Sequence, residues 1–436
     1  MKQRDLFFNP KRLFEELCSE DQLLTAYKSV KKNKGSAGID GVSLKDFETK
    51  LNEELGQLQK ELESWTYKPS PVRQVEIPKP GNKKEKRKLG VPTVRDRIVQ
   101  TAIKQLLEPL LDPTFSDHSY GFRPGRNQRQ AVESARDIVV SGKEWCVDID
   151  LAQFFDRVPQ DRLMTRLSKL IADKRIVRLV GMSLRSGIMN NGVYSATPEG
   201  TTQGSPLSPL LSNLVLDELD DFLEKRDFSF CRFADDLNAY VGSKKAAVRL
   251  MENLTTFIER KLKLKVNRDK SQVARSQLVK FLGMTIISGT VAIAPVSIDR
   301  AMAKVRELSS RGTSETLSQT IDNFNQWYRG WSNYYKMTQY PAQLGKIEAH
   351  FRRRIRARII DQHKSRRNLF RKLQTRGVAN LRARTVFSNR KRWALSKTIA
   401  MSKGYPNVWF EEQGLYTISD EKLEWWFERN VWIKFT

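Results

Sequence analysis

Carboxylates stand at two points of the chain where an extended segment is expected to end. Asp235 and Asp236 form a pair in a tight break between two runs that each have an extended pattern. Far upstream, the run that begins at Trp145 ends on Asp150. Carboxylates fixed on rigid backbone are the ligands that a pair of Mg²⁺ ions needs for phosphoryl transfer. Two such sites on a strongly basic chain predict phosphoryl-transfer chemistry on a nucleic acid.

The three acids are expected to differ in role. Polymerase-type chemistry uses two divalent ions about 3.5–4 Å apart, bridged by carboxylates. Asp150 and Asp235 are the candidates for the bridging ligands, and Asp236 for a more peripheral place. Each motif alone has a plainer interpretation, because an Asp-Asp pair in a turn is usually a solvated turn. Asp150 alone is equally consistent with a strand-end cap.

The charge of the chain favours a polyanionic partner. The 436 residues carry a net charge of +27, and residues 341–400 hold 18 Lys and Arg against two acids. So basic a chain repels itself unless a polyanion neutralises it, which points to nucleic acid. Aromatic residues among these cations favour RNA or single strands, on whose bases rings stack. The alternatives are a merely soluble cationic protein and, for the rings, core packing.

Cysteine and histidine usage excludes several other classes. Three cysteines and three histidines lie far apart, with no spacing typical of a zinc site or a disulfide framework. No run approaches the roughly 18 apolar residues of a membrane span, and no secretory signal is present at the N-terminus. We therefore expect a reducing, cytoplasmic location and no membrane partner.

The pattern of apolar residues predicts a mixed α/β region followed by a helical tail. Residues 1–70 have mainly helical periodicity, with one helix expected from Ser43 to about Trp65, and residues 73–90 resemble a cationic hairpin. Further helices are expected over 93–111, 159–184, about 208–225 and 244–264. Strands are expected at 145–150 and on both sides of Asp235-Asp236. This order predicts a sheet covered on one face.

Taken together, the motifs resemble those of the reverse transcriptases encoded by bacterial group II introns. The resemblance runs from about Asn33 to at least Trp409. The matching blocks are Asn33–Gly41, Ile77–Pro80 with Arg87–Arg97, Ser119–Arg126, Asp148–Asp156, Gln203–Asn213, Phe233–Asp236, Asn267 with Lys270-Ser271, Phe281–Gly283 and Trp327–Tyr335. Phe233 departs from the usual Tyr, and Thr201-Thr202 from the usual Thr-Pro. Neither change removes a carboxylate.

The resemblance implies a fold and a division into domains. The fold is α+β, a right-hand polymerase with fingers, a palm with an antiparallel sheet, and an all-helical thumb and maturase region. The implied ranges are an N-terminal extension and start of the fingers over 1–70, fingers and palm over 71–290, thumb over 291–340 and a basic RNA-binding domain over 341–436. No cysteine follows Cys231 and no histidine follows His363, so we expect no HNH endonuclease.

The resemblance also implies roles for individual residues. Asp150, Asp235 and Asp236 would be the catalytic triad and the ligands of two Mg²⁺ ions, with Mn²⁺ as a substitute. The implied contacts with the incoming nucleotide come from Arg73, Lys79, Arg87, Phe155, Gln203, Gly204 and Lys270. Phe155 would exclude a ribose 2′-hydroxyl, with Phe154 as the alternative. The implied RNA-binding residues are Arg352, Arg353, Arg356, Arg366 and Arg367.

We therefore predict an RNA-directed DNA polymerase that uses dNTPs, an RNA template and a DNA or RNA primer. It would also bind group II intron RNA and promote splicing and retrotransposition. A first alternative is an intron-independent relative that acts in DNA repair or phage defence. A second is an RNA-binding splicing factor without polymerase activity, against which the three intact acids weigh. The sequence leaves dimerisation open.

Overall fold

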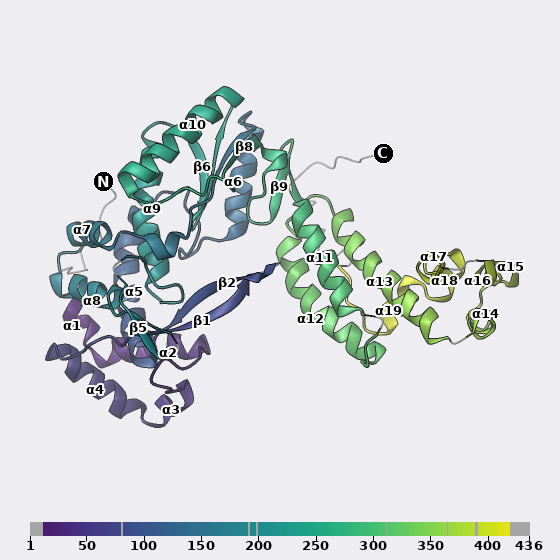
Figure 1. The fold of residues 1–436 in the computed structure, drawn as a ribbon, viewed down its shortest axis with the longest axis horizontal. Helices are drawn as coiled ribbons and strands as arrows, with labels where there is room; N and C mark the ends of the chain where they lie inside the picture. The colour runs from purple at the N-terminus through teal and green to yellow at the C-terminus, as the bar shows by residue number, and fades with distance from the viewer. Residues whose placement is uncertain are drawn as a thin grey trace. The chain divides into compact units, whose positions relative to one another are not determined.

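The computed structural model describes residues 12–79, 82–190, 192–197, 199–310, 312–363, 365–388 and 391–418. The chain divides into two units between Val279 and Lys280, and each unit is described by itself. Figure 1 shows the helices and strands of both. The second unit therefore includes the β-hairpin that follows Lys280.

Four helices open the described part of the first unit. They are α1 (Leu13–Leu17), α2 (Glu20–Lys32), α3 (Leu44–Thr49) and α4 (Leu51–Glu63). The single helix expected from Ser43 to Trp65 is wrong in one respect, because the backbone breaks at Lys50 (φ −123°, ψ 30°). Ser43 and Asp46 form a reciprocal capping box at the start of α3. Leu55, Leu58 and Leu62 are buried along one face of α4.

A four-stranded sheet follows, in the order β2-β1-β4-β5. It comprises β1 (Val72–Lys79), β2 (Asn82–Val91), β4 (Ile188–Asn190) and β5 (Val193–Ser195). The cationic hairpin is confirmed: β1 pairs antiparallel with β2, from Arg73 opposite Val91 to Ile77 opposite Arg87. Helix α5 (Val94–Leu111) comes next and is capped by Thr93, whose hydroxyl accepts from the Asp96 amide.

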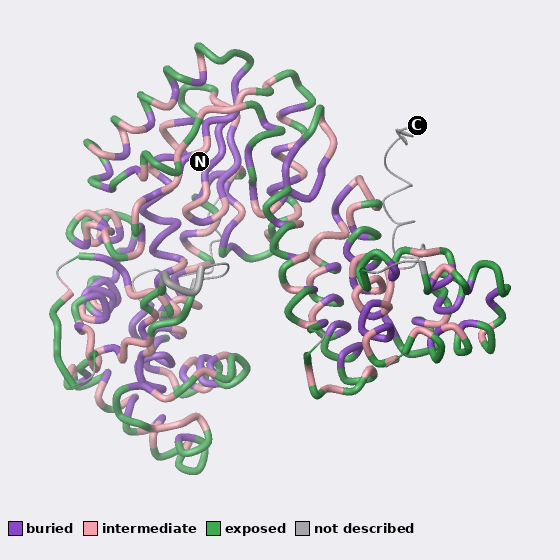
Figure 2. The backbone as a smooth tube through the Cα atoms, turned by 45° about the vertical axis from the view of Figure 1, so that its right-hand side comes forward, coloured by how far each residue is buried: buried purple, intermediate pink, exposed green. Residues whose placement is uncertain are grey.

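The second sheet of this unit is antiparallel throughout and has the order β6-β7-β3-β8. Its strands are β3 (Trp145–Ile149), β6 (Ser229–Phe233), β7 (Asp236–Val241) and β8 (Gln272–Arg275). The central strands are largely buried, as the purple segments in Figure 2 show. A strand whose side chains are buried on both sides belongs to a sheet that is covered on both faces.

Helices cover both faces of this sheet, so the expectation of one covered face is wrong. Arg232 of β6 bonds to Asp220 of α9 (Ser208–Glu224). Its neighbour Cys231 points to the opposite face, where the Cys231 thiol lies 3.3 Å from the Ser134 hydroxyl of α6 (Gln128–Val140). Helix α10 (Lys244–Phe257) packs on β3, β7 and β8 and continues as a π-helical turn over Ile258–Leu262.

The helix expected over 159–184 is also two helices, α7 (Gln160–Leu170) and α8 (Lys174–Leu184). Asp173 lies in the break and is buried. Its carboxylate accepts from the backbone amide of Arg175, which caps α8, and from that of Phe14 in α1. The interruption therefore also serves a contact with a distant helix.

The second unit begins with the hairpin of β9 (Met284–Ile287) and β10 (Thr290–Ile293) and is otherwise helical in its described part. The Val291 and Ile293 amides donate to the side chains of Gln339 and Gln343, which ties the hairpin to the helical part. Its helices are α11 (Pro295–Leu308), α12 (Leu317–Tyr335), α13 (Ala342–Gln362), α14 (Arg366–Thr375), α15 (Asn380–Ala383), α16 (Thr385–Ser388), α17 (Arg392–Leu395), α18 (Ile399–Gly404) and α19 (Asn407–Glu412). Phe324 of α12 stacks on Phe351 of α13 with ring centroids 3.9 Å apart.

The fold class is α+β, with antiparallel sheets in the first part of the chain and helices in the last. In the described ranges, every helix is too short or too polar to span a lipid bilayer.

Candidate active site

The strand register brings the two acidic segments together. In the pairing of β3 with β7, Asp148 lies opposite Asn238 and Ile149 opposite Leu237. One position further along each strand, Asp150 therefore faces Asp236. Asp235 lies in the two-residue loop between β6 and β7, whose strands pair up to Phe233 and Asp236. The sheet topology thus brings Asp150 and the Asp235-Asp236 pair to the same end of adjacent strands.

The negative charge of Asp150 acts on Asp235. Burial raises the pKa of Asp235 above its ordinary value, and the negative charge of Asp150 raises it further. The cations Arg87 and Arg232 act in the opposite direction. Two carboxylates that repel each other in a partly desolvated place gain from a bound cation, which removes both the repulsion and the cost of burial.

Asp150 is fixed by the segment that leads into β8. The Asn267 side-chain amide donates to Oδ2 of Asp150 at 2.9 Å, and the Asn267 backbone amide donates to the Asp150 carbonyl at 2.8 Å. The Ser271 hydroxyl accepts from the Asp150 amide at 3.0 Å. These bonds fix the direction of the carboxylate.

Two arginines of the cationic hairpin take different places. Arg87 on β2 is exposed, and its charge lowers the pKa of Asp235. The Arg73 guanidinium instead donates to the Ala37 carbonyl, with its Nη2 at 2.7 Å. That contact holds the glycine-rich loop 33–41 against β1. The side chain of Lys79 lies outside the described residues.

The expected neighbours of the incoming base pair lie in two places: Phe155 follows the acid-bearing strand β3, and Gln203 and Gly204 contact β2. Phe155 is half-buried in a short 3₁₀ turn, whereas Phe154 is buried. Gly204 has φ +107°, and a Cβ there would lie 2.5 Å from the Gly90 carbonyl oxygen. The Gln203 carbonyl accepts from the Gly90 amide at 2.7 Å. The close approach that glycine permits is therefore made to β2.

The remaining predicted residues are spread more widely. Lys270 is exposed in the turn between Asn267 and β8. In the second unit, the Arg356 guanidinium donates to the Tyr405 carbonyl, and Arg353 stacks on the Trp393 ring at 3.6 Å. Arg352 pairs with Glu348 at 3.4 Å, and both side chains are largely buried. Arg353 and Arg356 thus join α13 to later segments of this unit, whereas Arg352 pairs within α13 itself. Arg366 is half-buried, and Arg367 is exposed.

Residues that the sequence did not single out support the catalytic turn. Arg232 is fully buried and bonds to the Ala234 carbonyl, to Asp220 and to Asn213. The signal in the sequence is the place of Arg232 two residues after Phe230, which puts a cation on the apolar face of the predicted strand. Asn213 and Asn267 belong to quoted motifs, but their partners become visible only in the fold.

Family models match two parts of this chain. Residues 77–286 match the family "Reverse transcriptase (RNA-dependent DNA polymerase)", and residues 298–377 match "Group II intron, maturase-specific domain". The first match begins within β1, covers the other strands of both sheets of the first unit and includes all three acids.

Two relatives extend the comparison. Protein YkfC of Escherichia coli is 32% identical over 302 residues, covering 60% of this chain and 79% of that protein. Group II intron-encoded protein LtrA of Lactococcus lactis is 28% identical over 384 residues, covering 72% of this chain and 62% of LtrA. This chain thus spans less than two thirds of the length of LtrA.

Among solved structures, a chain of the partial Cas6-RT-Cas1–Cas2 complex is 25% identical, with 60% of this chain and 46% of that chain covered and a TM-score of 0.37. That score is too low to say anything of function. The two family matches and the relative from Escherichia coli decide the classification: this chain belongs to the group II intron-type reverse transcriptases and maturases, a family of RNA-directed DNA polymerases.

Proposed function

We propose that this chain extends a primer 3′ end with dNTPs on an RNA template, at a site formed by Asp150, Asp235 and Asp236. The observation that carries the proposal is the register of β3 with β7, which sets Asp150 opposite Asp236 and beside the Asp235 turn. The raised pKa of Asp235, caused by burial and by the charge of Asp150, supports a shared cation.

Two Mg²⁺ ions, with Mn²⁺ as a substitute, fit the donor set. The donors are carboxylate oxygens, which hard cations prefer. Within the described residues, no three His, Cys, Asp or Glu side chains lie close enough to hold a metal ion by themselves. Because Mg²⁺ is commonly held by one or two carboxylates together with substrate phosphates and water, this donor set is sufficient. When bound, the ions activate the 3′-hydroxyl and neutralise charge on the leaving phosphates.

The protein's own residues would bind and select the nucleotide. Arg87 supplies a cation beside the acids, and we assign it to the triphosphate. Arg73 and Lys79 lie on the paired strand β1, and Lys270 is exposed in the turn next to Asn267. Phe155, half-buried beside the acid-bearing strand, would exclude a 2′-hydroxyl by steric clash. Gln203 and Gly204 join this surface to β2.

We propose that the second part of the chain binds group II intron RNA and so promotes splicing and retrotransposition. The maturase-specific match at residues 298–377 and the excess of Lys and Arg over 341–400 support this role. On this proposal, residues 71–290 are fingers and palm, 291–340 the thumb and 341–436 the RNA-binding domain. The cysteines are buried and unbridged, as befits a reducing cytoplasm.

The test is primer extension on an RNA template with MgCl₂ and dNTPs, comparing the wild type with Asp235→Ala. We expect extension by the wild type and a loss of at least about 10³-fold in the variant, because a ligand of the reacting centre is removed. Equal extension by the two proteins would refute the assignment of the site. Asp148→Asn is the matched control, since Asp148 lies on the same strand two residues before Asp150.

A further inference from the structure

A fully buried arginine, Arg232, stands three residues before Asp235 on strand β6. Arg232 is 0% exposed, and its Nη1 donates to the Ala234 carbonyl oxygen at 2.9 Å. Ala234 is the first residue of the two-residue loop between β6 and β7, and Asp235 is the second. The guanidinium therefore bonds to the main chain next to Asp235 and not to the Asp235 carboxylate.

The arginine is itself held by helix α9. Its Nε donates to Oδ1 of Asp220 at 2.8 Å, its Nη2 pairs with Oδ2 of the same carboxylate, and its Nη1 also donates to Oδ1 of Asn213 at 3.0 Å. A buried cation is tolerated only with such complete pairing, and the bidentate geometry also fixes its direction. The side chain thus has one defined position from which to bond Ala234.

The loop 119–126 closes the same network from the other side. The Asn213 side-chain amide donates to the Gly121 carbonyl at 2.8 Å. The Tyr120 backbone amide donates to the Arg232 carbonyl at 2.8 Å. A Cβ on Gly121 would lie 2.2 Å from the Ala234 nitrogen, so only glycine permits this approach. Three segments distant in sequence thus meet at the Ala234–Asp235 turn.

The turn needs such support because of its backbone. Ala234 has φ +57°, a left-handed conformation that alanine rarely adopts. A residue in that region persists where its surroundings determine it, and such positions cluster at functional sites. Here the surroundings are the Arg232 guanidinium on the carbonyl side and Gly121 on the amide side.

We propose that Arg232 is a positioning residue for nucleotide addition, which fixes the Ala234–Asp235 turn, with Asp220 and Asn213, so that the Asp235 carboxylate stays beside Asp150. This inference rests on the proposed polymerase function. Arg232 acts through the turn and does not contact substrate. Loss of its fork geometry should therefore weaken the use of metal and the rate of addition, and leave primer–template binding unchanged.

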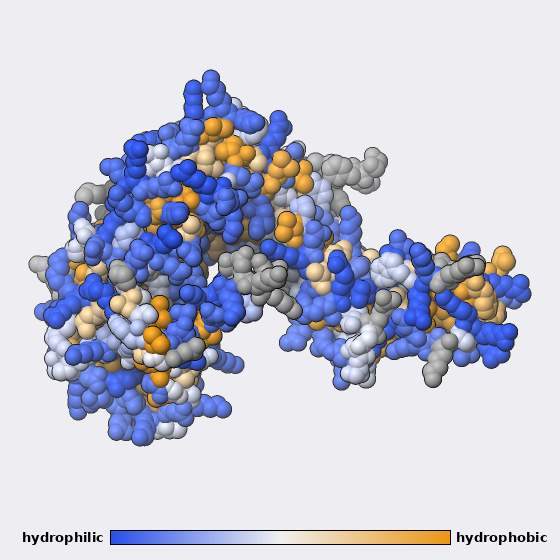
Figure 3. All heavy atoms as spheres, in the orientation of Figure 1, coloured by the Kyte–Doolittle hydropathy of each residue, from blue (hydrophilic) through white to orange (hydrophobic). Residues whose placement is uncertain are grey.

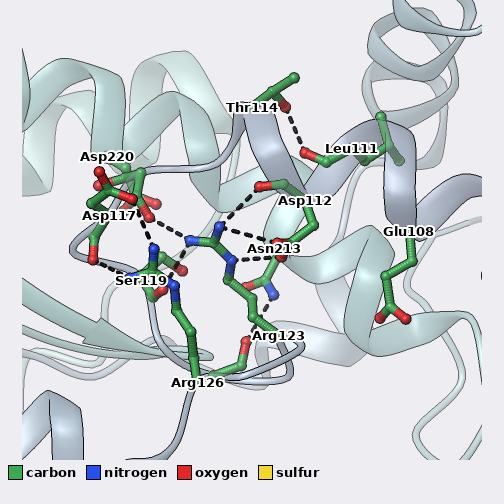
Figure 4. Close-up of polar contacts among 12 residues, drawn as sticks. Glu108, Leu111, Asp112, Thr114, Asp117, Ser119, Arg123, Arg126, Asn213 and Asp220 are labelled. Atoms are coloured by element: carbon green, nitrogen blue, oxygen red, sulfur yellow. Dashed lines mark hydrogen bonds and ion pairs between the residues drawn. The ribbon is translucent and has the colours of Figure 1, made fainter. Parts of the chain in front are cut away.

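A matched control exists in the same loop. Arg123 is also a buried arginine, with its Nε 2.7 Å from Oδ1 of Asp112 and its Nη1 bonded to the Ser119 carbonyl. In Figure 4 its side chain points toward Asp112, and Arg126 points toward Asp117. The Arg123 guanidinium donates its hydrogen bonds to Asp112, Ser116 and Ser119, and none of them reaches residues 234–236. It represents what a purely structural buried arginine does for this loop.

The experiment compares Arg232→Lys with Arg123→Lys, since lysine keeps the charge and loses the bidentate fork in both. Melting temperature, primer–template Kd, kcat for single-nucleotide addition and the MgCl₂ concentration at half-maximal rate are measured. Both variants should melt earlier. Only Arg232→Lys should lower kcat, by about 10- to 100-fold, and raise the MgCl₂ requirement. Its primer–template Kd should not change.

The inference is overturned if Arg232→Lys keeps the wild-type kcat and MgCl₂ requirement, or if Arg123→Lys alters both as strongly. Should Arg232→Lys fail to fold, Asn213→Ala decides the matter, because it removes the amide that links Gly121 to Arg232 and keeps the Asp220 pair. An unchanged MgCl₂ requirement in that variant would overturn the inference. An inactive wild type would contradict the proposed function as well, whereas an active wild type with unaffected variants contradicts this inference alone.

Discussion

Asp150 depends on Asn267 for the direction of its carboxylate. The Asn267 side-chain amide donates to Oδ2 of Asp150 at 2.9 Å. We predict that Asn267→Ala raises the MgCl₂ concentration for half-maximal primer extension by about 10- to 100-fold, the usual effect of removing a group that orients a metal ligand. A titration of single-nucleotide addition against MgCl₂ measures it.

Gln272→Ala is the control for this prediction. The Gln272 amide also bonds to a carboxylate of the same sheet, Oδ2 of Asp148, at 3.2 Å. Asp148 has no assigned role in catalysis, so the control should titrate like the wild type. If the two variants shift the MgCl₂ requirement equally, Asn267 has no special part in holding Asp150.

At the residue scale, the sequence predicts which acids matter and leaves their supports unseen. Asp150, Asp235 and Asp236 are chosen by residue type and by their places at strand ends. Arg232 and Asn213 bond to partners in other segments, so their roles depend on contacts that no local pattern contains. The same holds for Arg73, whose bond to the Ala37 carbonyl appears only when the loop 33–41 is folded.

At the scale of elements, helix α9 carries a second buried acid with a testable consequence. Burial raises the pKa of Asp217 to about 6, although Arg166 lies beside it and opposes the shift. Because the folded-state pKa exceeds the unfolded value of about 3.9, the folded chain holds this proton longer. Stability therefore falls as pH rises from about 4 to about 6 and then stays level in this respect.

We predict that Asp217→Asn stabilises the chain more at pH 8 than at pH 5, by about 1 kcal/mol in the free energy of unfolding. Arg166 keeps a partner in the variant, since its Nη1 lies 3.1 Å from Glu218. Urea unfolding at the two pH values measures the difference. A pH-independent effect of Asp217→Asn would contradict the assignment.

Strands and most helices follow from apolar periodicity, and the errors lie at interruptions. The β1–β2 hairpin, α5 and β3 are found where the pattern predicts them. The breaks at Lys50 and at residues 171–173 are missed, because apolar spacing continues across both. Asp173 serves Phe14, more than a hundred residues away in the chain. The second covered face of the sheet β6-β7-β3-β8 is missed because α6 packs on Cys231, which lies far from it in the sequence.

At the scale of the whole molecule, net charge predicts a polyanion partner without showing which cations face it. Arg352, Arg353 and Arg356 bond within the second unit. Arg371, Arg382 and Arg384 are exposed, and Leu381 beside them is 82% exposed. Figure 3 shows a mostly hydrophilic surface on this unit, with hydrophobic side chains near α15 and α16.

We predict that Arg371→Gln, Arg382→Gln and Arg384→Gln together weaken binding of a transcribed group II intron RNA and flatten its salt dependence. Each lost phosphate contact should reduce the slope of log K against log salt by about 0.7 to 0.9. Arg356→Gln should instead lower the melting temperature and leave the slope unchanged, because that guanidinium bonds to the Tyr405 carbonyl. A slope that only Arg356→Gln flattens would show that the exposed set is not the RNA-binding surface.

The central claim is that the carboxylates of Asp150 and Asp235 bind the same divalent ion. Cleavage of the polypeptide backbone by Fe²⁺ bound at that site tests it most directly. The full chain, with primer, RNA template and a non-reactive dNTP analogue, is loaded with Fe²⁺ in place of Mg²⁺ and treated with ascorbate and peroxide. Hydroxyl radicals formed at the ion cut the nearest backbone. We predict cuts at residues 149–151 and 234–236 in the wild type, and neither in Asp235→Ala. Cutting at only one of the two segments, or cuts at both that persist in the variant, would contradict the claim.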